Sequence, residues 1–404
     1  MSGIVVIGGG QAGASSVARL RSGGYGGAIT LIGEEPEPPY QRPPLSKKYL
    51  MGEMEKARLY LRPAAYYADN DITLITGARV TGIDPAAKTV RAGDQSYPYD
   101  DLILATGSVP RRLPAAIGGD LGGVHVVRTI ADIDAMVGDV REGARALIVG
   151  GGYIGLEAAA VAAQRGLQVT LVEMAERILQ RVAAPETSDY FRDLHRGHGV
   201  DLREGVGLSH LTSTDGRVSG AELSDGSTLD CDLVIVGVGI APATDLAEAA
   251  GLTLDNGIAV DALGRTSDPA IWAAGDCASF PWRGTRIRLE SVQNAIDQAE
   301  AVADNILGAE AAYDPHPWFW SDQYDVKLQI AGLNTGYDRL VVRPGDRPGS
   351  ASHWYYFGAN LLSVDAMNDP RAYMIGKRMI ENGKSPDAAA VADPAQNLKA
   401  LMAA

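Results

Sequence analysis

Short apolar runs that end at glycine or another small residue recur along the chain and predict buried β-strands. Such runs lie at 4–7, 29–32, 102–105, 146–149, 169–172 and 233–238. Strands of a parallel sheet are covered on both faces, so they read as continuous apolar runs and not as alternating ones. Ala-rich stretches of helical character follow two of the runs. The pattern therefore predicts an α/β fold built on parallel sheets.

The chain contains the same strand, glycine turn and helix twice. The turn 8–13 follows the run at 4–7, and the turn 150–155 follows the run at 146–149. Each copy continues into a second strand that ends in acid, at Glu34 and at Glu173. These are the parts of the dinucleotide-binding βαβ unit, so two copies predict two bound dinucleotides. The alternative is that one copy is only a packing turn.

Each turn carries three glycines with separate tasks: a tight turn, a close approach of pyrophosphate to the backbone, and close packing of helix on strand. The glycines are Gly8, Gly10 and Gly13 in the first copy and Gly150, Gly152 and Gly155 in the second. Tyr153 and Ile154, inside the second turn, are further cofactor-binding candidates. Glu34 and Glu173 are expected to accept hydrogen bonds from ribose hydroxyls. Glu35 is either a solvated charge or the true ribose ligand with an offset of one residue.

The residues after the second acid favour NADH over NADPH as the donor. Glu173 would repel a 2′-phosphate, and Met174, Ala175 and Glu176 follow it. Arg177 is the only nearby cation. A site for the 2′-phosphate normally supplies an Arg at this place.

Composition narrows the class of protein. The chain has 404 residues, 46% of them hydrophobic and 21% charged, which predicts two or three soluble domains. Its net charge of −14 disfavours nucleic acid and anionic membrane surfaces as partners. Two cysteines, Cys231 and Cys277, form no CxxC pair, so a redox-active dithiol is not expected. With no targeting or membrane-spanning run in view, a cytoplasmic protein is expected.

The character of the sequence changes after about Pro315. The aromatic run Trp318-Phe319-Trp320 is followed by strand-like segments at 339–342 and 354–357. The polar, Ala- and Pro-containing stretch from Glu381 onward is expected to form a tail helix. A separate C-terminal α+β domain is predicted to begin near Tyr313.

Several motifs together resemble one family, the NADH-dependent ferredoxin reductases of the putidaredoxin reductase group. They are the two glycine turns, Ala105-Thr106-Gly107, TSxPxIxAxGD at 266–276, RPPLSK at 42–47, ESVQNA at 290–295 and WFWSDQY at 318–324. The resemblance covers essentially the whole chain. It implies a glutathione-reductase-like α/β fold with two Rossmann-like domains, for FAD and NAD, and a C-terminal α+β interface domain. The expected boundaries are 1–110 and 242–313 for the FAD domain, 111–241 for the NAD domain and 314–404 for the C-terminal domain.

The resemblance also implies a set of cofactor contacts. FAD contacts are expected at Ala12, Glu34, Lys47, Val80, Arg128, Asp276 and Val292. Small residues that close buried strands, Thr106, Gly107 and Gly239, are further candidates. Val292 is predicted to begin a helix that runs to about Leu307, whose dipole would stabilise negative charge on the flavin. Arg42 and Arg128 could neutralise the FAD phosphates, although Arg42 could equally be a surface cation.

Lys47, Glu157 and Trp320 are the catalytic candidates. The resemblance places the Lys beside the reactive edge of the flavin, paired with the Glu, where a cation stabilises charge and the carboxylate orients the nicotinamide. The alternative for this pair is a purely structural salt bridge. Trp320 is implied to shield the flavin, or else it belongs to the core. His195 and His198 have one-turn spacing but lack a third ligand, so no metal site is expected.

The resemblance implies a [2Fe–2S] ferredoxin as acceptor, in a cytochrome P450 or ring-hydroxylating oxygenase system. Rubredoxin reductase, monodehydroascorbate reductase and an NADH-sensing flavoprotein resembling apoptosis-inducing factor remain alternatives. An acidic ferredoxin needs a local basic patch, for which Arg283, Arg286, Arg288, Lys327 and Arg339 are candidates. A monomer is expected, since nothing in the sequence demands an oligomer.

Overall fold

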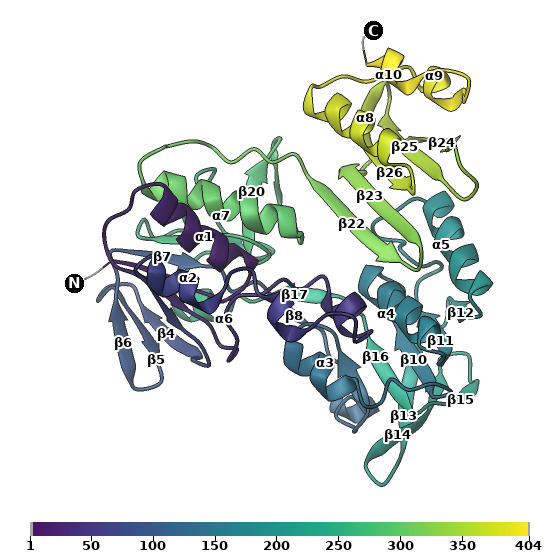
Figure 1. Cartoon of the computed structure of the whole chain (residues 1–404), viewed down its shortest axis with the longest axis horizontal. Helices are drawn as coiled ribbons and strands as arrows, with labels where there is room; N and C mark the ends of the chain where they lie inside the picture. The colour runs from purple at the N-terminus through teal and green to yellow at the C-terminus, as the bar shows by residue number, and fades with distance from the viewer. Residues whose placement is uncertain (1–2, 403–404) are drawn as a thin grey trace. The chain divides into compact units, whose positions relative to one another are not determined.

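The computed structural model describes residues 3–402, which pack as two compact units. Among these, the first unit contains residues 3–42, 55–109 and 240–317. The second contains residues 43–54, 110–239 and 318–402. Figure 1 labels many of their helices and strands. The predicted class, α/β with parallel sheets, is confirmed in both units.

The first unit is built on a five-stranded parallel sheet in the order β19-β7-β1-β2-β3. These strands are Ile271–Ala273, Asp101–Leu104, Ile4–Ile7, Ile29–Ile32 and Ile72–Ile75. All four side chains of β1 are at most 5% exposed because alternate residues enter two different cores. Ile4 and Val6 pack toward α1 (Gln11–Ser22) and α7 (Val292–Ile306). Val5 and Ile7 pack on the opposite side of the sheet.

Smaller elements complete the first unit. The antiparallel sheet β4-β5-β6 consists of Val80–Asp84, Thr89–Ala92 and Gln95–Pro98. The pair β8-β17 consists of Ser108–Pro110 and Ile240–Pro242, and β18-β20-β21 of Ile258–Ala259, Ala278–Trp282 and Thr285–Ile287. The short helices are η2 (Lys56–Leu59), α2 (Ala64–Asp69) and α6 (Asp245–Ala249).

The second unit repeats the parallel sheet in the order β12-β11-β10-β16-β9. These strands are Asp201–Glu204, Gln168–Glu173, Arg145–Val149, Leu233–Val236 and Val124–Val126. Its helices are η3 (Ala115–Ile117), α3 (Ile130–Met136), α4 (Tyr153–Gln164) and α5 (Pro185–Gly197). The antiparallel sheet β13-β14-β15 (Leu208–Thr214, Arg217–Leu223, Thr228–Asp230) shares a hydrophobic core with β10 and β16.

The same unit contains a C-terminal antiparallel sheet in the order β22-β23-β26-β25-β24. Its strands are Trp318–Gln323, Val326–Gly332, Asn360–Met367, Ala351–Phe357 and Arg339–Pro344. Helix α8 (Pro370–Glu381) packs on it and shares a core with α9 (Ala388–Ala392) and α10 (Leu398–Leu401). The tail helix predicted from Glu381 onward forms only as the two short helices α9 and α10. Helix α8 ends at Glu381, because Asn382 and Gly383 close it and Pro386 follows.

The segment 43–54 packs with the second unit, although the sequence places it inside the first predicted domain. It contains a short helical turn, η1 (Leu45–Tyr49). Tyr49 donates to Asp134 of α3 at 2.7 Å, and Arg165, at the end of α4, donates to the carbonyl of Met51 at 3.3 Å. These contacts fix the segment within the second unit, where Lys47 lies next to α4.

Candidate functional site: two dinucleotide turns and a buried ion pair

The first glycine turn has the geometry that a dinucleotide requires. Gly8 has φ +121°, and a Cβ there would lie 2.1 Å from the carbonyl oxygen of Ala105. A Cβ on Gly13 would lie 2.0 Å from the carbonyl oxygen of Gly8. At Gly10, by contrast, a Cβ would meet no atom of the described residues within 4 Å. The turn is thus closed toward the sheet and open at the N-terminus of α1, where a pyrophosphate would approach.

The second glycine turn has the same geometry. Gly150 has φ +107°, and a Cβ there would lie 2.5 Å from the carbonyl oxygen of Gly237. A Cβ on Gly155 would lie 2.0 Å from the carbonyl oxygen of Gly150. Gly152 is open in the same sense as Gly10, within the described part of the chain. The residues present therefore fit two dinucleotides, one at α1 and one at α4.

The acids of the two copies are not in the same register. Gly8 N–H donates to the carbonyl of Ile32, and Gly150 N–H to that of Val172, each at 2.9 Å. The next residue after each acceptor is Gly33 in the first copy and Glu173 in the second. Glu173 therefore corresponds in position to Gly33, and Glu34 lies one residue further along. The carboxylate of Glu173 accepts from the backbone N–H groups of Gly151 at 2.7 Å and Ala175 at 2.8 Å.

Glu34 and Glu35 have different surroundings. Glu34 is largely exposed and lies 3.3 Å from Arg79. Glu35 accepts a hydrogen bond from Arg42 Nη2 at 2.7 Å and another from Tyr40. Glu35 is therefore not a solvated charge. Arg42 already has a carboxylate partner, and its contact with FAD phosphates stays a prediction, as does the ribose contact of Glu34.

The first unit brings several predicted FAD residues together. A Cβ on Gly275, which has φ +84°, would lie 3.1 Å from the Cβ of Ala12 in α1. The next residue, Asp276, accepts from Ser108 Oγ at 2.8 Å. Val292 begins α7, which is capped by the side chain of Ser291 and ends at Ile306, as the sequence predicts. The glycine turn, Asp276 and α7 thus belong to one structural neighbourhood.

The remaining cofactor candidates occupy several settings. Val80 begins β4 and its side chain is 7% exposed. Thr106 Oγ1 donates to the carbonyl of Ala243 at 2.7 Å, and Gly107 has φ +69°. Gly239, with φ +100°, accepts at its carbonyl from the N–H of Arg111 at 2.9 Å. Arg128 and Lys47 belong to the second unit. Contact of each residue with a cofactor remains a prediction.

Lys47 and Glu157 form an ion pair, as expected. Lys47 Nζ lies 2.8 Å from Glu157 Oε2, and the Glu157 side chain is only 4% exposed. Glu157 lies in the first turns of α4, two residues after Gly155. Ser46 Oγ donates to Oε2, and Ser321 Oγ donates to Oε1, each at 2.7 Å. The two serines come from distant parts of the chain, so sequence spacing gives no signal that would find them.

The aromatic run lies on β22 at the edge of the C-terminal sheet. Trp320 is partly buried, with its ring 5.6 Å from that of Trp318 and 6.4 Å from that of Phe319. The Phe319 ring lies 4.9 Å from that of Tyr153, the first residue of α4. Ile154 is 43% exposed. The run thus contacts the nucleotide helix, while the role of Trp320 toward flavin stays a prediction.

The cysteines and histidines have structural surroundings. Cys231 and Cys277 are buried free thiols, and burial raises the pKa of both, to about 12 for Cys231. His195 is fully buried and contacts Gln323, whereas His198 stacks on the ring of Tyr324 at 3.7 Å. Within residues 3–402 there is no group of three or more His, Cys, Asp or Glu side chains that could hold a metal ion. The same residues contain no helix long and apolar enough to span a membrane.

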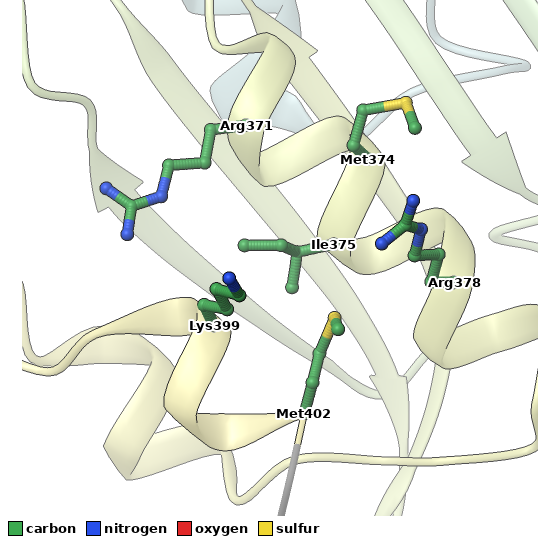
Figure 2. Close-up of a pocket in the computed structure, with 6 residues that line it drawn as sticks. All are labelled: Arg371, Met374, Ile375, Arg378, Lys399 and Met402. Carbon is green, nitrogen blue, oxygen red and sulfur yellow. The ribbon is translucent and has the colours of Figure 1, made fainter.

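A cavity with basic walls lies in the C-terminal part of the second unit. Its volume is about 210 Å³, and side chains from α8 and from α10 and its end line it (Figure 2). The lining consists of Arg371, Arg378 and Lys399 together with Met374, Ile375 and Met402. The chain as a whole carries a net charge of −14, whereas this cavity has three basic side chains around an apolar floor. The cavity is therefore a locally basic site on an acidic protein.

The basic residues predicted for a docking surface differ in whether their side chains already contact other groups of the protein. The Arg283 guanidinium lies over the ring of Trp282 at 4.4 Å. Arg286 donates to the carbonyl of Val260 at 3.0 Å, and Arg288 to that of Asp276 at 3.1 Å. Lys327 and Arg339 are exposed on β23 and β24. None of these positions is tested as a docking residue, and all five stay candidates.

Fold and site together define a two-dinucleotide oxidoreductase, and comparisons with known proteins identify its family. Residues 2–299 match the pyridine nucleotide-disulphide oxidoreductase family, and residues 318–402 match the reductase C-terminal family. A ferredoxin–NAD(P)(+) reductase of Sphingomonas is 44% identical over 99% of this chain and 97% of its own length. The chain belongs to the pyridine nucleotide-disulphide oxidoreductase family, among its ferredoxin reductases. Membership implies FAD and NADH as cofactors.

Solved structures agree with this assignment. The putidaredoxin reductase of a covalent putidaredoxin reductase–putidaredoxin complex superposes with a TM-score of 0.95 at 39% identity, covering 100% of this chain and 98% of that one. The ferredoxin reductase for the CYP199A2 system of Rhodopseudomonas palustris has the same TM-score and identity and covers 99% of both chains. The resemblance drawn from the sequence motifs is therefore confirmed, as is the class of fold.

Proposed function

We propose that this protein takes hydride from NADH and passes the electrons singly to a [2Fe–2S] ferredoxin of a cytochrome P450 or ring-hydroxylating oxygenase system. The observation that carries the proposal is the buried Lys47–Glu157 pair, whose Glu157 lies two residues after the last glycine of the second dinucleotide turn. Support for the acceptor comes from relatives named as ferredoxin reductases and from the putidaredoxin complex. FAD, when bound, supplies the conversion of a two-electron donor into two single electrons.

The residues of the second unit bind and orient the donor. The open N-terminus of α4 at Gly152, which has no side-chain cap, offers backbone N–H groups and a positive dipole end to the NADH pyrophosphate. Glu157 accepts hydrogen bonds on both carboxylate oxygens and is therefore held in one orientation. We assign it to the nicotinamide carboxamide, and Lys47 to the charge that develops as hydride is transferred.

The residues of the first unit hold FAD. Gly10 and the N-terminus of α1 would hold the pyrophosphate, and Asp276 would accept from hydroxyls of the ribityl chain. The dipole of α7, which begins at Val292, would stabilise negative charge on the flavin pyrimidine edge. Support comes from the proximity of Gly275 and Ala12, which brings the Gly-Asp turn to the first glycine turn.

NADH is the preferred donor. The Glu173 carboxylate, fixed by two backbone N–H groups, leaves a negative charge at the end of β11, where a 2′-phosphate would lie. Arg177, the nearest cation in sequence, donates to Ser188 and to the carbonyl of Gln180. Its guanidinium is therefore occupied within the protein fold.

Anaerobic stopped-flow spectroscopy of the purified protein tests the proposal. The holoenzyme is mixed with NADH or NADPH, and putidaredoxin is then added as the test [2Fe–2S] acceptor. Rapid bleaching of the flavin by NADH alone, followed by reoxidation with putidaredoxin, is the expected result. Slow bleaching with a persistent long-wavelength band would instead favour an NADH-sensing flavoprotein. Reoxidation by rubredoxin or monodehydroascorbate but not by putidaredoxin would move the protein to one of those reductases.

The basic cavity on α8 and α10 is a candidate docking surface for an acidic ferredoxin. Its three cations surround exposed methionine, which suits a partner with acidic groups around an apolar contact. Charge reversal at Arg378 and Lys399 is compared with reversal at Lys327 and Arg339. The set that slows ferredoxin reduction at low salt, with NADH-dependent flavin bleaching unchanged, contains the docking residues. The expected cytoplasmic location, the monomeric state and the domain boundaries stay predictions.

A further inference from the structure

The Glu157 carboxylate is the end of a buried chain of hydrogen bonds. Ser321, whose hydroxyl donates to Glu157 Oε1 at 2.7 Å, accepts from the side-chain amide of Gln323 at 3.2 Å. Gln323 Oε1 lies 2.9 Å from His195 Nε2, and His195 Nδ1 lies 3.3 Å from the hydroxyl of Tyr324. Ser321, Gln323 and His195 are each 0% exposed. The chain thus runs from α4 through β22 to α5.

The carboxylate at one end fixes the direction of every donor in the chain. A carboxylate in an ion pair has no proton to give, so the Ser321 hydroxyl must donate to it. The Ser321 oxygen then accepts, which assigns the NH₂ group of Gln323 to the serine side and its oxygen to the histidine side. His195 must consequently carry its proton on Nε2 and accept on Nδ1 from Tyr324. One arrangement of protons satisfies all the groups.

His195 can serve as a constant donor because it stays neutral. Burial lowers the pKa of His195 to about 4, and its neighbour His198 acts in the same direction. The other groups that face it are the amide of Gln323 and the hydroxyl of Tyr324, and neither offers a negative charge. The ring therefore keeps a single tautomer throughout the neutral pH range.

We infer that Ser321, Gln323 and His195 are positioning residues that hold Glu157, and through it Lys47, in the orientation needed for hydride transfer. The inference rests on the proposed function of the Lys47–Glu157 pair. Hydrogen bonds to a charged acceptor are stronger than neutral ones, and aligned donors in a low-dielectric interior polarise one another. A carboxylate held at both oxygens keeps its orientation when nucleotide arrives. The side-chain amide of Gln323 interrupts any relay of protons, so the chain orients the carboxylate and does not conduct.

The same interface offers a matched control. Thr187, also on α5 and also 0% exposed, bonds His353 at 2.7 Å and Asp365 at 2.9 Å. This second buried cluster joins α5 to β25 and β26, and within the described residues its hydrogen bonds do not reach Glu157. Thr187→Val therefore removes buried hydrogen bonds from the same interface without touching the chain.

The experiment compares holoenzymes of four variants with wild type. Gln323→Glu keeps the shape but removes the donor to Ser321, His195→Phe removes the donor to Gln323, and His195→Gln restores one. We expect Gln323→Glu and His195→Phe to slow flavin reduction by NADH about ten-fold. The expected change in NAD⁺ affinity for these two variants is less than about two-fold, because no nucleotide contact is lost. His195→Gln and Thr187→Val should stay within about three-fold of wild type.

A second measurement is independent of turnover. The Nε2–H proton of His195 should give a downfield NMR resonance in the oxidised holoenzyme, and it should move upfield in Glu157→Gln, although two residues separate the groups. Rates of Gln323→Glu and His195→Phe equal to that of Thr187→Val, with an unmoved resonance, would overturn the inference. If wild-type flavin is not reduced by NADH at all, the proposed function fails instead. The resonance still reports on the chain in that case, and the two failures are distinguishable.

Discussion

The two glycine turns have nearly the same backbone and different side chains. Gly8 and Gly150 both have φ beyond +100°, and both turns leave the middle glycine open at a helix N-terminus. Two residues after the last glycine, however, the first turn has Ser15 where the second has Glu157. Ser15 accepts a long bond from Gln11, at 3.4 Å, whereas Glu157 is the centre of a buried ion pair.

The comparison separates cofactor binding from chemistry. Backbone N–H groups and the absence of Cβ atoms are sufficient to hold a pyrophosphate, so both turns can share them. Hydride transfer also needs full charges at defined positions, which here come from ionised side chains. The second copy carries the charged residues Glu157 and Glu173. At the corresponding positions the first copy has Ser15 and Gly33.

The largest expected effect comes from adding a Cβ at the first glycine of one turn while the other turn stays unchanged. In Gly8→Ala the new Cβ would clash with the carbonyl of Ala105 at a positive φ, which we expect to cost about 3 kcal/mol or more. The protein should be purified without flavin. Gly150→Ala should retain flavin, because the clash lies in the other turn, yet lose reduction by NADH. Flavin absorbance per protein and stopped-flow bleaching measure the two outcomes.

Gly10→Ala and Gly152→Ala are the controls for these substitutions. Their Cβ atoms would meet no described atom, so thermal unfolding of the apoprotein should not change. Only dinucleotide affinity should fall, at α1 for the first variant and at α4 for the second. A Gly10→Ala protein that binds flavin normally would show that the open position is not the pyrophosphate site.

The next largest effect is expected from breaking the Lys47–Glu157 ion pair, which the first turn lacks. Lys47→Ala should slow flavin reduction by about 10² to 10³-fold, because it leaves Glu157 buried without its cation and removes charge stabilisation at the reacting edge. FAD content should remain near wild type. The stopped-flow rate constant at saturating NADH is the measurement. A normal rate would reduce the pair to a structural salt bridge.

The third effect is on stability against acid, and it should be confined to the second unit. Burial lowers the pKa of His195 and of His353 to about 4, from 6.5. Folding lowers the pKa of both histidines. Their contribution to folding stability is therefore fully present above pH 6.5 and is lost as the pH falls through 4. Asp365 acts oppositely, since burial raises its pKa to about 6 and its contribution is lost as pH rises.

As the pH falls, the two histidines lower the stability by more than the aspartate raises it. The free energy of unfolding should therefore decrease by about 3 kcal/mol between pH 7 and pH 4. Hydrogen exchange of the holoenzyme at pH 4.5 should therefore show the peptides of α5 and β25 opening before those of α1 and β1. His195→Gln should reduce the pH dependence. Equal acid sensitivity in both units would contradict this account.

The smallest effect concerns donor choice. Glu173→Gly gives the second turn the residue that the first has at Gly33. Removing the negative charge should decrease the preference for NADH over NADPH by about ten-fold, mainly through the KM for NADPH. Ratios of kcat/KM for the two donors measure it. Glu176→Gly, a nearby acid outside the turn, is the control and should leave the ratio unchanged.

Local chemistry determined much of this protein before any tertiary contact formed. The apolar runs at 4–7 and 146–149 fold as buried parallel strands, and the glycines after them take the positive φ that only glycine adopts cheaply. Both features depend on residues close in sequence. The two dinucleotide turns, the helix from Val292 and the family could be predicted for that reason.

Tertiary structure alone decided what surrounds Glu157. Ser46, the β22 pair Ser321 and Gln323, and His195 come from three distant segments, and a side chain's hydrogen-bond partner across such separations depends on how whole sheets and helices pack. The register of the parallel strands likewise decides that Glu173 corresponds to Gly33 instead of Glu34. The periodicity of a sequence predicts which elements form, whereas buried polar partners follow from the assembled fold.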